Sequence, residues 1–262
     1  MIDAHVHIGL ETFLARPIPP EKLARPAFRD RMVNSLEMQL ERMDENGVDQ
    51  AIVFGFPLEE IDREQSNHYV LEAAAQHPNR LIPFMLVGDD TEDWLARGAK
   101  GFKQQNILYA PERFDLMRAY AVMAEAGVPM LIHFRASAGY SVPEQARAIL
   151  KQVPTLKLMV AHMGRNLPNS ADRVDEALYG LADYPNVVFE TSTVRDPAAI
   201  ELAVQVVGDD RVVFGSDYPF NSYEDANPLA KEIDVIRRAQ IPESARRKIF
   251  TENMQRYLEV GV

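Results

Sequence analysis

The stretch Ile2-Asp3-Ala4-His5-Val6-His7-Ile8, close to the first residue of the sequence, is the starting point for the fold. Its apolar residues are typical of a strand, and side chains two positions apart point to the same face of a strand. His5 and His7 therefore lie side by side. Two neighbouring imidazoles are costly to bury unless they hold something positive. The stretch predicts a strand that carries a divalent metal site.

The composition is that of an ordinary globular protein and excludes several function classes. Of the 262 residues, 47% are hydrophobic and 26% are charged, which is enough for a sizeable core. The net charge of -11 and the pI of about 5.1 argue against a general nucleic-acid-binding surface, because such a surface is basic. No apolar run reaches the ~18 residues of a membrane span, and we recognise no secretion signal. We expect a cytoplasmic protein that binds a small molecule, and a homo-oligomer is compatible with this composition.

The sequence contains no cysteine. Disulfides, thiolate metal sites and cysteine nucleophiles are therefore excluded. Histidine, aspartate and glutamate remain as the side chains that can hold a metal ion.

One alternation runs along the whole sequence, in which apolar, β-branched segments are each followed by a helical pattern. The segments expected to be strands are 2–8, 48–55, 81–87, 99–104, 128–134, 157–163, 186–192 and 211–217. Helices are expected at 30–46, 64–77, 91–97, 112–126, 143–152, 170–183, 197–207 and 228–239. Buried strands that alternate with helices imply a parallel sheet, and eight such units in about 260 residues predict a single-domain (β/α)8 TIM barrel over residues 1–262. A doubly wound open sheet is the structural alternative.

The loop after the first predicted strand, residues 10–29, is too long for an ordinary connection. It contains Pro17, Pro19, Pro20 and Pro26, which make it stiff. We expect this loop to cover the mouth of the active site. A plain surface insertion is the alternative.

Polar side chains lie at the carboxyl ends of three further predicted strands. His133 ends the fifth strand, His162 the sixth and Asp217 the eighth. Active sites of such barrels lie at the carboxyl ends of the strands. The first and eighth strands of a closed barrel are neighbours, so Asp217 can reach His5 and His7. Taken singly, each histidine could be structural, and Asp217 could be a turn or cap residue. Their shared placement predicts an active site.

These residues and their surroundings resemble the amidohydrolase superfamily, specifically the amidohydrolase-related branch that contains aminocarboxymuconate-semialdehyde decarboxylase. The matching motifs, in chain order, are Asp3-Ala4-His5-Val6-His7, Gly101-Phe102-Lys103, His133, Ala161-His162-Met163-Gly164, Gly215-Ser216-Asp217-Tyr218-Pro219, and Ile249-Phe250-Thr251-Glu252-Asn253 with Tyr257-Leu258. The resemblance covers nearly the whole chain in the right order. The motifs are specific for superfamily and fold, and weak for substrate.

The resemblance implies one divalent metal ion, expected to be Zn²⁺, held by His5, His7, His133 and Asp217. An open coordination position would remain for water or substrate, as a catalytic metal requires. Asp217 would act as general base on metal-activated water, and His162 would polarise the substrate or act as an acid or base.

Lys103, on the fourth predicted strand, has three interpretations. In two-metal members of the superfamily a carboxylated lysine on this strand bridges the ions, so a second metal is expected if Lys103 is carboxylated. Its Gly-Phe-Lys setting resembles the single-metal branch, which favours an unmodified lysine that contacts a substrate anion. A structural ion pair is the third interpretation. With Lys103, Arg135 and Arg165 could form a pocket for a substrate carboxylate, although either arginine could instead be a solvated loop residue.

The sequence therefore predicts a metal-dependent hydrolase of an ester, lactone or amide of a small carboxylic acid. The alternative is a non-oxidative, metal-dependent decarboxylase of an aromatic or muconate-type acid, which would use nearly the same site. A metal-free lactonase is a further alternative. So is a non-catalytic barrel that retains its metal ligands, which predicts a closed site without an open coordination position.

Overall fold

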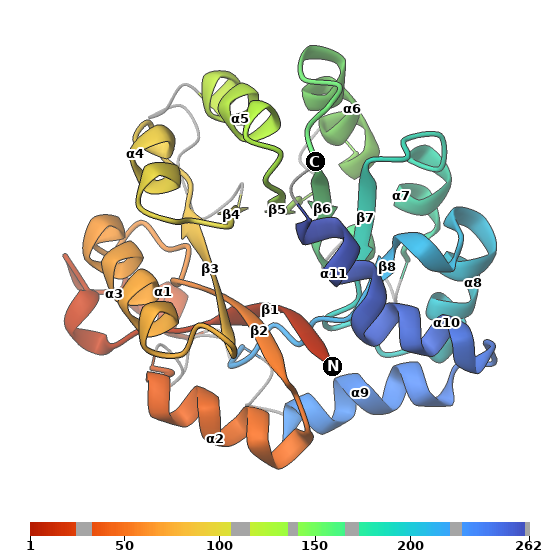
Figure 1. Cartoon of the computed structure of the whole chain (residues 1–262), viewed down its shortest axis with the longest axis horizontal. Helices are drawn as coiled ribbons and strands as arrows, with labels where there is room; N and C mark the ends of the chain where they lie inside the picture. Colours follow the sequence, from red (N-terminus) through yellow and green to blue (C-terminus); the bar gives the residue numbers. More distant parts are fainter. Residues whose placement is uncertain (25–32, 106–115, 136–140, 166–172, 221–226, 260–262) are drawn as a thin grey trace.

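In the computed structural model of the chain, eight parallel strands follow one another in sequence order around a nearly closed barrel (Figure 1). The structure describes residues 1–24, 33–105, 116–135, 141–165, 173–220 and 227–259. The strands are β1 (Ile2–His7), β2 (Gln50–Phe54), β3 (Leu81–Leu86), β4 (Gly101–Gln105), β5 (Met130–His133), β6 (Leu158–Val160), β7 (Val187–Glu190) and β8 (Val212–Val213). All eight predicted strands are confirmed, and the chain is a TIM barrel in one domain.

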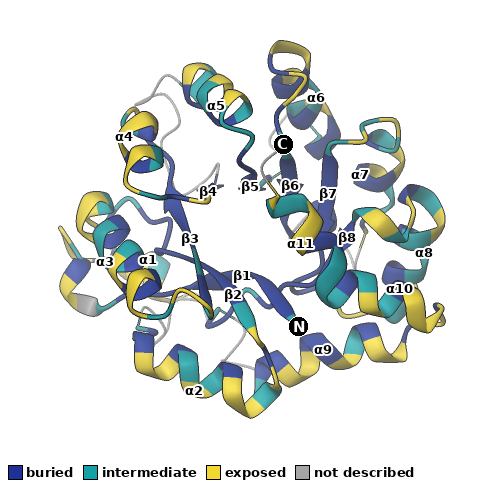
Figure 2. Ribbon diagram, viewed as in Figure 1, coloured by how far each residue is buried: buried dark blue, intermediate teal, exposed yellow. Residues whose placement is uncertain are grey.

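Helices form a ring around the strands, with exposed residues facing outward and buried residues facing the barrel (Figure 2). Those that connect consecutive strands are α2 (Leu36–Asn46), α3 (Arg63–Gln76), α4 (Thr91–Ala96), α5 (Leu116–Glu125), α6 (Val142–Gln152), α7 (Asp175–Gly180) and α8 (Pro197–Val207), and α9 (Pro228–Arg238) follows β8. Within the described ranges, no helix has the length and apolar character needed to cross a membrane.

The first of these helices begins later than the predicted 30–46. Asn34 and Gly9 exchange backbone hydrogen bonds of 2.9 and 3.0 Å, which holds residue 34 in an extended conformation. Ser35 then caps α2 by accepting a hydrogen bond from Met38 N. Gly47 ends the helix in the left-handed conformation, with φ of 66°.

Hydrogen bonds between β1 and the segment after β8 close the barrel. Strand β8 is only two residues long, shorter than the predicted 211–217, but the chain continues beside β1. Asp217 N donates to His5 O at 2.8 Å. His7 N donates to Tyr218 O at 2.8 Å. The segment that follows β8 therefore runs along the two histidines of β1, as the predicted neighbourhood of first and eighth strands requires.

The last helix, α11 (Asn253–Leu258), closes the amino-terminal end of the barrel. The barrel interior is an apolar cluster made of Ile2, Ala4, Ile52, Phe54, Phe84, Leu131, Met159, Ala161, Val188, Val213 and Met254. Met254 of α11 is buried in this cluster, and Tyr257 and Leu258 of the same helix pack against it. Asn253 Nδ2 donates to Val212 O at 2.8 Å, at the first residue of β8. The helix therefore seals the end of the barrel that lies opposite the strand-end histidines.

The described part of the loop after β1 packs on the loop after β2. It contains a short 3-10 turn (Glu11–Phe13) and helix α1 (Pro20–Leu23). One small apolar cluster joins the two loops and contains Phe13, Ile18, Phe56, Leu58 and Ile61. Lys22 Nζ also pairs with Glu60 Oε1 at 2.7 Å. Residues 25–29 lie outside the described part, and a covering role for residues 10–29 stays a prediction.

We expect Met254→Ala to lower the free energy of unfolding by about 2–5 kcal/mol, because it leaves a cavity in a packed interior. The Met254 side chain is only 1% exposed. Met38→Ala is the matched control, since the same side chain on α2 is 43% exposed. Urea unfolding followed by circular dichroism measures both. Equal losses in the two variants would contradict the role given to α11.

Candidate active site

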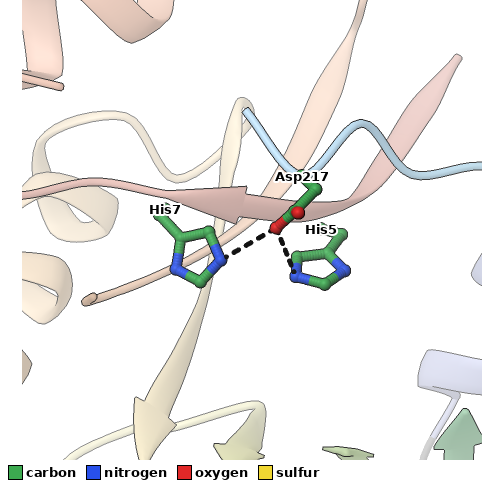
Figure 3. Close-up of side chains that lie close together, drawn as sticks. All are labelled: His5, His7 and Asp217. Carbon is green, nitrogen blue, oxygen red and sulfur yellow. Dashed lines mark hydrogen bonds and ion pairs between the residues drawn. The ribbon is translucent and has the colours of Figure 1, made fainter. Parts of the chain in front are cut away.

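His5, His7 and Asp217 converge at the carboxyl end of the barrel (Figure 3). Asp217 Oδ1 lies 3.1 Å from His5 Nε2 and 3.1 Å from His7 Nε2. Both histidines are buried. Asp217 has a φ of 56°, a left-handed conformation that costs a non-glycine residue about 1–3 kcal/mol. The structure thus holds this carboxylate against the two imidazoles at some cost in backbone strain.

Hydrogen bonds on the far side of each ring determine which nitrogen can bind a cation. His5 Nδ1 donates to Glu190 Oε2 at 2.7 Å, and His7 Nδ1 donates to Gly55 O at 3.1 Å. A carboxylate and a carbonyl oxygen can only accept, so these partners assign a proton to each Nδ1. Nε2 of each ring is left to face the Asp217 oxygen.

The charges of the site favour an added cation at this point. Burial lowers the pKa of His7 to about 4, so its ring is neutral near pH 7 and its Nε2 lone pair faces the carboxylate. Burial and the charge of Lys103 also act to lower the pKa of His5. The carboxylates of Glu190 and Asp217 outweigh them, and the net shift is upward. Two imidazole nitrogens and one carboxylate oxygen directed at a single point form a donor set that fits a divalent metal ion.

A second group of possible ligands, His5, His162 and Glu190, is already linked through a hydroxyl. Ser192 Oγ lies between them, 2.9 Å from Glu190 Oε2 and 2.9 Å from His162 Nδ1. These three side chains therefore form a hydrogen-bonded cluster. The group His5, His7 and Asp217 is the candidate metal site.

His133 and His162 lie together beside this site. His162 Nε2 is 3.1 Å from His133 Nδ1. His162 follows β6 in a tight 3-10 turn (Ala161–Gly164) and has a φ of 55°, so the predicted strand 157–163 ends earlier than expected. No group of possible metal ligands found among the described residues includes His133. Its role as fourth ligand stays a prediction.

The hydrogen bonds of this pair assign the proton of His162 and give His133 two nitrogen partners. His162 Nδ1 donates to Ser192 O at 3.1 Å, which assigns its proton to Nδ1. Burial lowers the pKa of His162 to about 3, so its Nε2 carries a lone pair near pH 7. His133 Nδ1 lies 3.1 Å from this nitrogen and 3.0 Å from Gln105 Nε2, an amide nitrogen that can only donate. His133 Nδ1 therefore lies between an acceptor and a donor.

Lys103 lies in the same site, almost fully buried on β4. Its Nζ is 3.3 Å from His5 Nε2 and 5.3 Å from the centre of the Phe54 ring. Burial lowers the pKa of Lys103 to about 8, although the charges of Asp217 and Glu190 act in the opposite direction. Lys103 places a positive charge next to the candidate metal site, and its contact with a substrate anion stays a prediction.

The two arginines proposed from the sequence lie in different settings. Arg135 follows β5 and is partly exposed. Burial, His162 and then Arg135 lower the pKa of His133, so the Arg135 charge acts on the site. Arg165 donates to Thr193 O at 2.6 Å and so holds the loop after β7. Substrate binding by either arginine is a prediction that these contacts leave open.

Glu190 is the site residue that the sequence reasoning missed. It is the last residue of β7 and is fully buried. Its signal was present, because Glu190 ends the apolar run Val187-Val188-Phe189 in the same way that His133 ends the fifth strand. Searching every strand end for acids, and not only the motif residues, would have found it.

The profile of the amidohydrolase family matches residues 2–259 of the chain. The chain belongs to this family. Among curated proteins, it is 23% identical over 304 aligned residues to the gamma-resorcylate decarboxylase of Polaromonas sp. strain JS666, a match that covers 90% of this chain and 91% of that protein.

Solved structures share the fold. The 5-carboxyvanillate decarboxylase from Sphingomonas paucimobilis superposes with a TM-score of 0.72 at 19% identity, covering 99% of each chain. The dihydroxybenzoic acid decarboxylase from Polaromonas sp. JS666 superposes with a TM-score of 0.69 at 18% identity, covering 98% of this chain and 96% of that one.

These comparisons correct the main functional prediction. Hydrolysis of an ester, lactone or amide was expected from the sequence, with decarboxylation as the alternative. The curated relative that matches along most of the chain is a decarboxylase, as are several of the similar solved structures, so the prediction of a hydrolase is wrong. The two reactions can share one metal site, and the metal-ligand motifs did not distinguish between them.

We expect Asp217→Asn to weaken the binding of an added divalent metal ion, with Mn²⁺ as the probe, by about tenfold or more, because it removes the only negative charge of the three-residue cluster. Isothermal titration of metal-free protein measures the affinity. Asp234→Asn, a change at an exposed acid of α9, is the control and should keep the wild-type affinity. An unchanged affinity in Asp217→Asn would show that the ion binds elsewhere.

Proposed function

We propose that this protein is a metal-dependent, non-oxidative decarboxylase of a small aromatic or muconate-type carboxylic acid. The observation that carries the proposal is the match to gamma-resorcylate decarboxylase along 90% of the chain, a length that includes most of the barrel. Related structures add support, since one decarboxylase was solved with 2,6-dihydroxybenzoate bound. The substrate we propose is accordingly an anionic aromatic acid that carries a hydroxyl group.

We propose Mn²⁺ as the metal, in place of the zinc expected from the sequence. The dihydroxybenzoic acid decarboxylase relative contains manganese and the inhibitor 2-nitroresorcinol. His5, His7 and Asp217, with His133 as a fourth ligand, would hold the ion, and a set with a carboxylate and no thiolate suits Mn²⁺. When bound, a divalent cation would polarise the oxygen atoms of the substrate and help to orient it.

The side chains around the site have the charges that decarboxylation needs. In this reaction the bond between ring carbon and carboxyl carbon breaks, carbon dioxide leaves, and the ring carbon takes up a proton. Lys103 and Arg135 would bind the substrate carboxylate before it leaves, and Arg165 would complete this basic pocket.

Proton transfer falls to Asp217 and His162 in this proposal. Burial would raise the pKa of Asp217, but the nearby charge of His5 acts against it, and that pKa lies well below its usual range. Asp217 is therefore ionised and would accept a proton from a substrate hydroxyl, then return it to the ring carbon. His162, neutral near pH 7, would serve as a second acid–base group.

We expect the purified protein to release carbon dioxide from 2,6-dihydroxybenzoate or a related hydroxybenzoate, measured with a coupled carbon dioxide assay. Treatment with a chelator should abolish the activity, and added Mn²⁺ should restore it, because the proposed reaction needs the ion. Turnover of lactones or esters without carbon dioxide release would refute decarboxylation. Full activity after removal of all metal would refute the role of the ion.

We expect Arg135→Ala to raise KM for the acid by about 10–100-fold with a smaller change in kcat, since a charge-assisted hydrogen bond is worth about 1.5–3 kcal/mol. Steady-state kinetics measure both constants. Arg118→Ala is the control, because Arg118 lies exposed on α5 and should leave KM unchanged. An unchanged KM in Arg135→Ala would remove Arg135 from the substrate pocket.

A further inference from the structure

We infer that Glu190 is the positioning residue of this site, which holds His5 with its Nε2 toward the metal and ties His5 to the turn that carries His162. The inference rests on the metal site of the proposed function. It assigns no step of the reaction to Glu190, whose side chain is fully buried beneath the reacting groups.

Four hydrogen-bond donors converge on the Glu190 carboxylate. Oε2 accepts from His5 Nδ1 at 2.7 Å and from Ser192 Oγ at 2.9 Å. Oε2 also accepts from the backbone N–H of His162 at 3.2 Å. Oε1 accepts from the backbone N–H of Ser192. With its oxygens engaged in this way, Glu190 serves as a common acceptor for three strand ends, β1, β6 and β7.

The first of these contacts determines which nitrogen of His5 can bind a metal. All four named partners of the Glu190 carboxylate are donors, so its oxygens act as acceptors. An oxygen that accepts from His5 keeps the His5 proton on Nδ1. Such an acceptor behind a metal-binding histidine orients the ring and makes it a better ligand. Without it, His5 could carry its proton on Nε2 and present an N–H to the cation.

The remaining contacts of the Glu190 carboxylate also orient His162. Ser192 Oγ donates to Glu190 and accepts from His162 Nδ1 at 2.9 Å. The direct bond from His162 N supports a residue whose φ of 55° is unfavourable for histidine. One carboxylate therefore sets the orientation of a metal-binding histidine and of the proposed acid–base histidine together.

Gly215 shows that the space around this carboxylate is closed. A Cβ atom added at Gly215 would overlap Oε1, Cδ and Cγ of Glu190. No left-handed φ is found at Gly215, so the glycine is required for space and not for backbone conformation. Gly215→Ala should therefore displace the Glu190 carboxylate without changing its chemistry.

Mn²⁺ affinity of the metal-free protein tests the inference without use of activity. Glu190→Gln keeps the size of the side chain but turns one acceptor into an N–H donor that faces other donors. We expect a loss of affinity of about 10–100-fold in Glu190→Gln and a loss in the same direction in Gly215→Ala. Glu60→Gln is the matched control, because Glu60 is equally buried but pairs with Lys22 away from His5, and its Mn²⁺ affinity should equal that of the wild type.

Nitrogen-15 NMR of the histidine rings reads the protonation of His5 directly. His5 signals are identified by their loss in His5→Gln. We expect Nδ1 of His5 to carry a proton in the metal-free wild type and to lose part of that proton population in Glu190→Gln. An unprotonated Nδ1 in the wild type would overturn the inference, and this measurement stands even where the variants do not fold. Wild-type Mn²⁺ affinity in a folded Glu190→Gln would also overturn it.

These outcomes separate the inference from the proposed function. A protein that binds Mn²⁺ with Nδ1 of His5 protonated, yet releases no carbon dioxide from aromatic acids, would refute the reaction and support the role of Glu190. A protein that releases carbon dioxide, and whose Glu190→Gln variant keeps wild-type Mn²⁺ affinity, would refute the role of Glu190 and support the reaction.

Discussion

Closure of the barrel between β1 and the segment after β8 is the constraint on which the site depends. The backbone hydrogen bond from Asp217 N to His5 O, 2.8 Å long, is part of this closure. It also places the Asp217 carboxylate beside the histidines. His7 and Asp217 are 210 residues apart in the sequence and 3.1 Å apart in the fold. An open sheet would leave β1 and β8 at different positions and would separate these ligands. The same hydrogen bonds therefore complete the fold and assemble the site.

The residues with strained backbone conformations lie at the carboxyl ends of the strands, beside the proposed active site. The non-glycine residues with positive φ in the described part of the chain are His162, Met163, Thr193 and Asp217, which lie after β6, β7 and β8. Each costs about 1–3 kcal/mol and persists only where surrounding contacts hold it. At Thr193 one such contact is a 2.9 Å hydrogen bond from its N–H to buried Glu232 of α9. The barrel thus holds the residues that follow these strands in backbone conformations that they would not adopt without the surrounding contacts.

Charge links the candidate metal site to the proposed substrate pocket. Asp217 and Glu190 place two carboxylates around His5, and buried Lys103 approaches the same ring from β4. This arrangement can hold a cation and an organic anion next to each other. It also explains why the prediction of a hydrolase failed. Metal ligands and strand-end acids are common to hydrolysis and decarboxylation, so the motifs that identified the family carried no information about the bond that is broken.

The sequence by itself determined the barrel and the strand ends that carry most of the candidate site, because strand–helix alternation and residues at strand ends are local patterns. His5 and His7 share a face whatever surrounds them, and His133, His162 and Asp217 could be placed from the ends of apolar runs. Glu190 was equally readable in principle. Only the tertiary structure decided which ring nitrogens carry protons. It also decided that Ser192 Oγ lies between Glu190 and His162, and that Lys103 Nζ lies 3.3 Å from His5 Nε2. These features arise from contacts between distant strands, whose relative positions are set by barrel closure and not by any local pattern.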